Sequence, residues 1–347
     1  MASTTDKNSE ICSHLERVGG IDCNGVFDLS VPPEELIARA TELTRDIFSS
    51  ADSRRRMLLY APIYLSSYCI NHCRYCGFNN TRQIERKHLG LAEALEESNI
   101  LLRRGIRHQL LVGGDAPHLT TTEYYVEKIA AMKSLGVSPA IEIAPQSEDS
   151  YASMVEAGVC GVTLYQETYD ERLYTLYHPK GPKSSYEWRL EAMDRAARGG
   201  IGRLGFGVLL GLADPVEDVA AMMDHASGIT REFPDRTLAF SLPRIHSAPR
   251  GFEVPYAVDD DLFVRLYCTL RLAFPRAELV LSTRESRSLR DRLAKICITQ
   301  MSAGSSTSPG GYGQPPSDEQ FPITDHRSVG EVADWLEDEG FCVAWDI

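Results

Sequence analysis

Short apolar runs alternate with longer amphipathic segments over most of this 347-residue chain. Apolar runs of this length suit strands buried on both faces, and the segments between them are long enough for helices. The alternation therefore predicts an α/β fold of parallel strands joined by helices. Eight runs can be counted, which is the strand number of a TIM-type (β/α)8 barrel. They cover residues 58–65, 108–112, 140–144, 161–165, 204–210, 238–242, 278–282 and 297–301.

The residues before the first run predict an N-terminal helical extension. Pro32 and Pro33 suit the first turn of a helix, where a missing N–H costs little, and the predicted helix continues over 34–48. We therefore divide the chain into an extension over residues 1–55 and a barrel with a C-terminal closing segment over residues 56–347.

One helix between the fourth and fifth runs carries signals at both ends. Ser184 and Glu187 have the spacing of a capping box, and apolar residues then recur on one helical face. Gly199 and Gly200 end the pattern. The sequence predicts a single helix between these signals.

Charge and composition narrow the class of ligand. The formal net charge of −13 argues against nucleic acid and anionic membranes as partners, so a small molecule is expected. The N-terminus lacks the apolar core of a signal peptide, and no apolar run is long enough to span a bilayer. Six of the nine cysteines are scattered without a disulfide framework. A cytoplasmic enzyme is expected, because thiols stay reduced there.

The other three cysteines, Cys69, Cys73 and Cys76, come shortly after the first apolar run and lie within one stretch of eight residues. A four-iron cluster normally takes four thiolates, so three would leave one iron open for an exchangeable ligand. A tetrahedral zinc site is the alternative, with His72 as the fourth ligand. His72 lies between two of the cysteines and is badly placed to close that tetrahedron, so the spacing favours a 4Fe-4S cluster.

Polar residues gather at the carboxyl ends of the predicted strands, where barrel enzymes build their active sites. Glycines after the second run would let the backbone approach a ligand closely, although an ordinary turn is the plainer interpretation. An acid within the third run would be costly to bury unless paired, so it indicates either a ligand contact or a structural ion pair. These residues are Gly113, Gly114, Asp115 and Glu142, with Gln166 and Glu167 after the fourth run.

The CxxxCxxC spacing, with Tyr75 directly before the third cysteine, resembles the radical S-adenosylmethionine (SAM) superfamily. The resemblance implies that the amino and carboxylate groups of SAM bind the open iron, and that the reduced cluster cleaves SAM to a 5′-deoxyadenosyl radical. Asp115 stands where the closest relatives of that motif carry glutamate. The SAM contacts implied by the resemblance are Tyr75, Gly113, Gly114, Asp115, Glu142, Gln166, Glu167 and Arg189.

Longer stretches, from about residue 60 to the C-terminus, resemble the tyrosine lyase branch of that superfamily. The branch cleaves the Cα–Cβ bond of tyrosine, giving 2-iminoacetate (dehydroglycine) and 4-cresol. It includes the 2-iminoacetate synthases of thiamin biosynthesis and the FeFe-hydrogenase maturation lyases, which carry a second cluster in a C-terminal extension. The stretches are residues 62–66, 76–78, 86–87, 165–169, 177–184, 187–190, 282–286, 301–307 and 309–312.

No cysteine-rich segment follows residue 342, which favours the thiamin-type reaction. Three alternatives stay open. They are a hydrogenase-maturation-type lyase without the second-cluster domain, a radical SAM lyase or mutase acting on another amino acid, and an iron–sulfur carrier without catalysis.

The resemblance implies that Arg284, after the seventh run, holds the substrate carboxylate, since guanidinium forms a bidentate fork with that group. Ser282 is a second candidate for substrate contact. The plainer alternative for Arg284 is an ion pair with Glu285 or Asp291. The implied partners are the tyrosine substrate, a one-electron reductant such as flavodoxin or ferredoxin, and a thiazole-forming protein, without nucleic acid or membrane.

Overall fold

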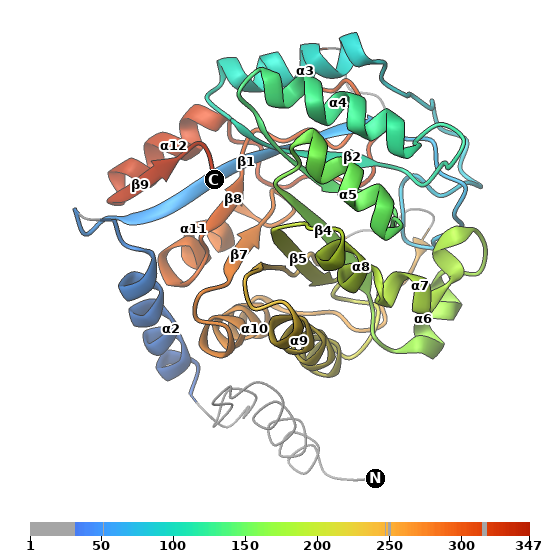
Figure 1. Cartoon of the computed structure of the whole chain (residues 1–347). Coiled ribbons are helices and arrows are strands. Elements are labelled where there is room, and N and C mark those ends of the chain that lie inside the picture. Colours follow the sequence, from blue (N-terminus) through green and yellow to red (C-terminus); the bar gives the residue numbers. More distant parts are fainter. Residues whose placement is uncertain (1–31, 51, 247, 249–250, 314–317) are drawn as a thin grey trace.

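The computed structural model describes residues 32–347 apart from 51, 247, 249–250 and 314–317. Parallel strands close into a barrel with helices around its outside (Figure 1). The barrel strands are β1 Arg55–Ser66, β2 His108–Gly113, β3 Ser138–Glu142, β4 Gly161–Glu167, β5 Arg203–Val208, β6 Thr237–Ser241, β7 Glu278–Leu281 and β8 Gln300–Ser302.

Strand β1 closes the barrel because it pairs with β8 over Leu58–Tyr60 and with β2 from Tyr60 onward. Its first residues, Arg55–Leu58, instead pair with a ninth strand, β9 Phe341–Ala344, so β9 and β2 share one edge of β1. The predicted (β/α)8 barrel is therefore confirmed, and β9 is an addition that the apolar pattern did not predict.

The helices pack against the outer face of the barrel. Many begin at a Ser, Thr or Asp whose side chain accepts from a backbone N–H of the first turn, as at Thr121, Ser147, Asp214 and Ser328. The helices are α2 Pro33–Phe48, α3 Leu91–Arg103, α4 Thr122–Ser134, α5 Glu148–Ala157, α6 Glu171–Tyr177, α7 Tyr186–Leu190, α8 Ala192–Arg198, α9 Pro215–Glu232, α10 Asp260–Ala273, α11 Arg287–Ile296 and α12 Val329–Asp338.

The helix predicted from Ser184 is wrong in its first half. The Ser184 hydroxyl donates to the carbonyl of Gly181 within a short 3-10 turn, so no capping box forms. The helical chain is then interrupted at Glu191, between α7 and α8. The last predicted strand, 297–301, is also shifted, since Cys297 caps α11 and β8 begins at Gln300.

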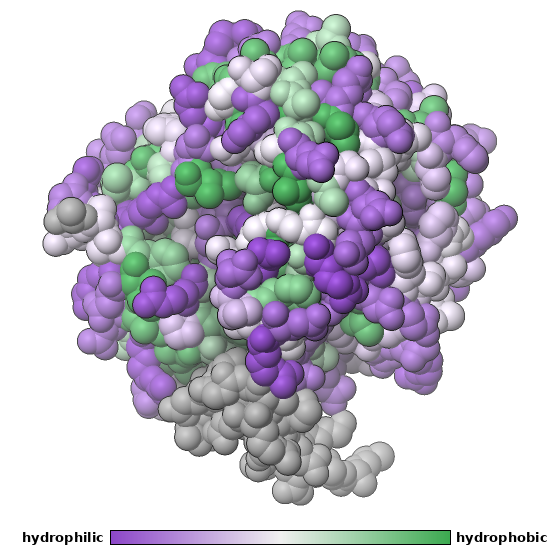
Figure 2. Space-filling model, in the orientation of Figure 1, coloured by the Kyte–Doolittle hydropathy of each residue, from purple (hydrophilic) through white to green (hydrophobic). Residues whose placement is uncertain are grey.

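Helix α2 confirms the predicted helix over 34–48 and packs against α10 and α11. Most of the predicted extension over 1–55 lies outside the described residues, so its boundary stays a prediction. Figure 2 shows polar residues over most of one face of the molecule, with apolar residues in small separate groups. In the described part of the chain, no helix is long and apolar enough to cross a membrane.

Two apolar layers support the site. The larger one lies between the outward side chains of the strands and the helices. The smaller one fills the barrel interior and reaches the residues that flank the cysteines. Because the strands pack against apolar side chains on both faces, their carboxyl ends form a rigid rim. The interior layer contains Tyr60, Tyr64, Phe78, Leu110, Val112, Ala140, Ala239 and Val280.

Candidate active site

The three-cysteine loop leaves the carboxyl end of β1 and packs tightly against the end of β2. The Ile70 N–H donates to the carbonyl of Asp115 at 2.8 Å. At Gly114 an added Cβ would overlap the carbonyl oxygen of Tyr68 and lie 3.2 Å from the Cβ of Cys69. Glycine at this position therefore allows the turn after β2 to touch the cysteine loop, which any side chain would prevent.

Asn71, between Cys69 and Cys73, joins this loop to two other segments. Its amide donates to a carboxylate oxygen of Asp115 at 2.8 Å, and its carbonyl oxygen accepts from the backbone N–H of Lys183 at 2.8 Å. The backbone of the cysteine loop adds hydrogen bonds to the carbonyls of Tyr177 and Lys180. Two segments far apart in sequence, at Asp115 and over residues 177–183, thus hold the cysteine loop in place.

The cysteines are free thiols whose surroundings suit a cluster. Burial raises the pKa of Cys73 to about 12, and burial likewise raises the pKa of Cys76. The Cys76 sulfur nevertheless accepts from the backbone N–H of Phe78 at 3.4 Å and from the Gln320 amide at 3.9 Å. Such donors stabilise a metal-bound thiolate and tune iron–sulfur clusters.

A single-ion zinc site does not fit the described residues. Among them, no three His, Cys, Asp or Glu side chains converge closely enough to hold one metal ion. His72 instead lies 3.4 Å from the side-chain amide of Asn80. A four-iron cluster has no need of that convergence, because each cysteine reaches a different iron. The three cysteines and their N–H···S bonds therefore fit the cluster.

One cavity brings the cysteines together with most of the predicted SAM contacts. Its lining combines polar groups from the ends of β2, β3 and β4 with apolar side chains from the barrel interior. The predicted residues that line it are Cys69, Cys73, Cys76, Gly113, Gly114, Asp115, Glu142, Glu167 and Arg189.

Glu167 is the centre of a buried charge cluster on this wall. It forms an ion pair with Lys183, and Arg189 lies 3.6 Å from the same oxygen. Burial alone would raise its pKa, yet the Lys183 and Arg189 cations hold the pKa of Glu167 below its ordinary value. Glu167 also has a positive φ of 74°, which strains a residue other than glycine and marks a position fixed by its surroundings.

Arg284 lies above Phe321, with its guanidinium carbon 3.5 Å from the ring centroid. The two acids proposed as its structural partners are occupied: Glu285 pairs with Arg244 and His246, and Asp291 pairs with Arg287 and Arg327. Within the described residues no acid pairs with Arg284, and its buried Nε has no hydrogen-bond partner. The guanidinium thus has no acidic partner in the described part of the chain, and its contact with a substrate carboxylate stays a prediction.

Four predicted residues do not line the cluster cavity: Arg284, described above, and Gln166, Tyr75 and Ser282. Gln166 is buried, and its amide nitrogen has no partner among the described residues. The Tyr75 hydroxyl lies 2.8 Å from Nε2 of His178. The Ser282 hydroxyl accepts from the backbone N–H of Arg284 at 3.4 Å, so it supports the turn that carries that residue. Their contacts with SAM or substrate stay predictions.

The structure also adds residues that sequence reasoning missed. Asn71, Lys183 and Gln320 all line the cavity. Asn71 and Lys183 lie within the motifs that suggested the family, so their positions carried a signal. Gln320 lies 244 residues after the cysteine that it contacts, and nothing local in the sequence marks it.

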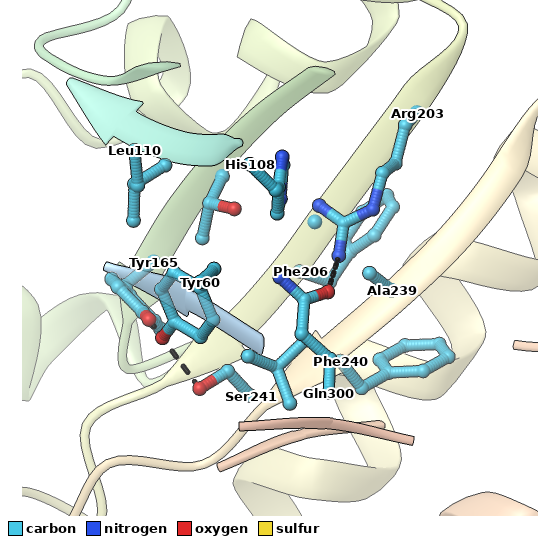
Figure 3. Close-up of a pocket in the computed structure, with 13 residues that line it drawn as sticks. Tyr60, His108, Leu110, Tyr165, Arg203, Phe206, Ala239, Phe240, Ser241 and Gln300 are labelled. Carbon is cyan, nitrogen blue, oxygen red and sulfur yellow. Dashed lines mark hydrogen bonds between the residues drawn. The ribbon is translucent and has the colours of Figure 1, made fainter. Parts of the chain in front are cut away.

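Below this cavity, toward the amino ends of the strands, the barrel interior contains a second, smaller space (Figure 3). Tyr165 lines both spaces, and its hydroxyl donates to Ser241 at 3.4 Å. Arg203 spans the floor with an ion pair to Glu278 at 2.5 Å and a hydrogen bond to Gln300 at 2.6 Å. The free space is about 10 Å³, the least that one water needs, so this lower space is too small for an organic ligand.

Comparison with known proteins agrees with this geometry. A model of the radical SAM superfamily matches residues 63–226, and a model of the Biotin and Thiamin Synthesis associated domain matches residues 241–342. The 2-iminoacetate synthase of Escherichia coli (strain K12) is 37% identical over 314 residues, which are 90% of this chain and 82% of that protein.

Solved structures give the same result. A crystal structure of HydG, a maturase of the FeFe-hydrogenase, matches with a TM-score of 0.88 and 30% identity, covering 99% of this chain and 77% of HydG. HydG from Carboxydothermus hydrogenoformans has a TM-score of 0.86 and 32% identity, covering 98% of this chain and 80% of that one. The chain belongs to the radical SAM superfamily, in the family that contains the 2-iminoacetate synthases.

Proposed function

We propose that this protein is a tyrosine lyase of the 2-iminoacetate synthase type, which cleaves the Cα–Cβ bond of L-tyrosine to 2-iminoacetate and 4-cresol. The observation that carries the proposal is Arg284, which has no acidic partner among the described residues and acts electrostatically on Glu142 in the wall of the three-cysteine cavity. An arginine without an acidic partner at the mouth of a barrel suits the carboxylate of an amino acid. The relationship to the 2-iminoacetate synthases identifies tyrosine as the candidate.

Cys69, Cys73 and Cys76 would hold the 4Fe-4S cluster, and the polar wall from Gly114 to Arg189 would hold SAM. When bound, these groups supply an electron and a 5′-deoxyadenosyl radical able to remove a hydrogen atom from the substrate. Arg189 is a cation suited to the SAM carboxylate, and Glu167 is an acceptor suited to ribose hydroxyls. Lys183 neutralises Glu167, which limits the cost of burying that carboxylate.

The substrate side of the site must orient tyrosine and exclude water. Arg284 would fix the carboxylate, and its position over Phe321 restricts the guanidinium to one plane. Phe78, Val112 and Leu164 give the cavity an apolar wall suited to an aromatic ring. An apolar wall also keeps water from a reactive intermediate.

The partners and location follow from the same proposal. A one-electron reductant such as flavodoxin or ferredoxin would have to reach the cluster, and the unstable imine suits direct use by a thiazole-forming protein. A cytoplasmic location agrees with the cysteines, which form no disulfide among the described residues.

The proposal is tested on the full chain, reconstituted with iron and sulfide without oxygen and supplied with SAM and a reductant. Tyrosine, phenylalanine and tryptophan are offered separately, and 5′-deoxyadenosine, the aromatic product and glyoxylate are measured. Tyrosine is expected to give 4-cresol and glyoxylate, the hydrolysis product of the imine. A different aromatic product would identify another substrate, and SAM binding without cleavage would indicate a carrier.

The likeness to HydG supports a second candidate, a lyase of the hydrogenase-maturation type. The same incubation separates the two when carbon monoxide and cyanide are measured as well. The thiamin-type reaction predicts glyoxylate without carbon monoxide or cyanide. Formation of carbon monoxide and cyanide by this chain would favour the maturation-type reaction.

A further inference from the structure

Glu142 is a second charged group, after Arg284, that has no ion-pair partner among the described residues. It is the last residue of β3, and its backbone lies in register with Val112 of β2. Among the described residues, no hydrogen bond or ion pair involves its carboxylate, and part of the side chain is open to the cluster cavity. A carboxylate enclosed in this way is costly unless something binds it.

Glu142 and Arg284 come from opposite sides of the barrel. Strand β3 is separated from β7 by three strands in each direction around the sheet. Arg284 is nevertheless the cation with the strongest electrostatic effect on Glu142, and the two do not come within the 4.0 Å of an ion pair. Two unlike charges from opposite strands therefore influence one another without contact, and neither has an ion-pair partner among the described residues.

The charged and titratable groups that act on Glu142 come from several elements around it. Arg284, Lys183 and Arg189 favour its charged form, whereas Glu167 disfavours it. The hydroxyls of Tyr60, Tyr64 and Tyr165 also lie within electrostatic range of it. Burial is the largest influence and raises the pKa of Glu142 to about 7, so the group can gain or lose a proton near neutral pH.

We propose that Glu142 binds the α-ammonium group of the substrate and accepts a proton from it, while Arg284 holds the carboxylate of the same molecule. This inference rests on the proposed function and extends it. A zwitterionic amino acid matches the two unpaired charges in sign and number. The sequence had suggested a SAM contact for Glu142, but the cations on the proposed SAM wall, Lys183 and Arg189, are paired with Glu167 and not with Glu142.

The proton transfer has a chemical reason. An ammonium nitrogen has no lone pair, so removal of a hydrogen atom from nitrogen is easier after one proton has left. In this step an N–H bond of the ammonium breaks, its electron pair stays on nitrogen, and an O–H bond forms on Glu142. No electron is gained or lost, and no further reactant is needed. An acid with a pKa near neutrality suits this task better than an ordinary glutamate.

The first test measures binding to the anaerobic, cluster-loaded protein with SAM present. Calorimetry compares tyrosine with 3-(4-hydroxyphenyl)propionate, which keeps the carboxylate and phenol but lacks the amine. Glu142→Gln should weaken tyrosine binding by about 10-fold or more, the usual range for a lost charge-assisted hydrogen bond. Binding of the amine-free acid should not weaken. Glu156→Gln, the same change at an exposed position on α5, is the control.

The second test follows 4-cresol formation against pH. The wild-type rate should fall below about pH 7 as Glu142 becomes protonated, whereas Glu142→Gln should be slow and lack that acid limb. Glu142→Asp keeps an acid and should recover part of the rate. Equal weakening of tyrosine and its amine-free analogue would overturn the inference. So would loss of SAM binding, which would make Glu142 a SAM contact, or an unchanged cresol rate.

Failure of the inference and failure of the proposed function give different results. If wild-type protein cleaves tyrosine and Glu142→Gln does so equally well, only the role of Glu142 is wrong. If wild-type protein releases no 4-cresol, the proposed function fails and the inference falls with it.

Discussion

The side-chain amide of Asn71 donates to a carboxylate oxygen of Asp115 at 2.8 Å, and this bond joins the cysteine loop to the end of β2. The carbonyl oxygen of the same Asn71 side chain accepts from Lys183, so one residue fixes the position of three segments. Asp115 is therefore engaged by the protein itself. It also lines the cluster cavity, so its contact with SAM stays a prediction.

Asn71→Ala removes both bonds and should loosen the cysteine loop. We expect less iron per chain after reconstitution and faster loss of the cluster to a chelator, because the loop gains conformational freedom. The iron content and the visible absorption of the cluster are the measurements. Asn80→Ala, at an exposed position in the same loop, is the control and should load normally. Equal retention by the two variants would contradict the role of Asn71.

Gly114→Ala should have a stronger effect on cluster loading. The added methyl would overlap the carbonyl of Tyr68, and backbone on both sides prevents an easy shift. We predict a folded protein that fails to hold a full cluster, measured by iron content beside a circular dichroism spectrum. Gly202→Ala is the matched control, since nothing lies within 4 Å of its added Cβ. Full loading of Gly114→Ala would show that the loop tolerates displacement.

Glu278→Gln tests the floor of the barrel. It would leave the buried Arg203 cation without a charged partner, and breaking a buried pair costs about 3–5 kcal/mol. Urea unfolding of the cluster-free protein measures the loss. The exposed pair of Lys295 and Glu339 provides the control, because Glu339→Gln should cost less than about 1 kcal/mol.

The same pair predicts a pH dependence. Burial alone would raise the pKa of Glu278, but Arg203 holds that pKa below its ordinary value of 4.5. The unfolded chain therefore binds the proton more tightly than the folded protein does. The stabilisation should be fully present above the ordinary value and should disappear as the pH falls through the lowered one. The difference in unfolding free energy between wild type and Glu278→Gln should therefore become smaller as the pH falls through the lowered pKa of Glu278. A difference that stays constant over this pH range would contradict the pairing.

The barrel could be predicted from the sequence because its strands are buried on both faces and appear as continuous apolar runs. Strand β9 could not, because four residues after a glycine carry little periodic signal. The interruption of the helix at Glu191 was not predicted either. The capping box predicted at Ser184 does not form, because the Ser184 hydroxyl donates to the carbonyl of Gly181.

The cluster ligands could be predicted for a similar reason, because their spacing is local. Asn71 and Lys183 meet across 112 residues, and only the folded barrel brings them together. The unpaired state of Arg284 also needed the structure. Sequence offered Glu285 and Asp291 as neighbours, and only the fold shows that other arginines occupy them.

The most direct measurement is the amount of 4-cresol released per 5′-deoxyadenosine, in wild-type protein and in Arg284→Ala. The exposed Arg287→Ala is the matched control. We predict that wild type and Arg287→Ala release the two products in comparable amounts. Arg284→Ala should keep its cluster and cleave SAM slowly without releasing 4-cresol, because tyrosine is no longer held in position. Undiminished 4-cresol from Arg284→Ala, or none from wild type, would contradict the assignment of this site to tyrosine cleavage.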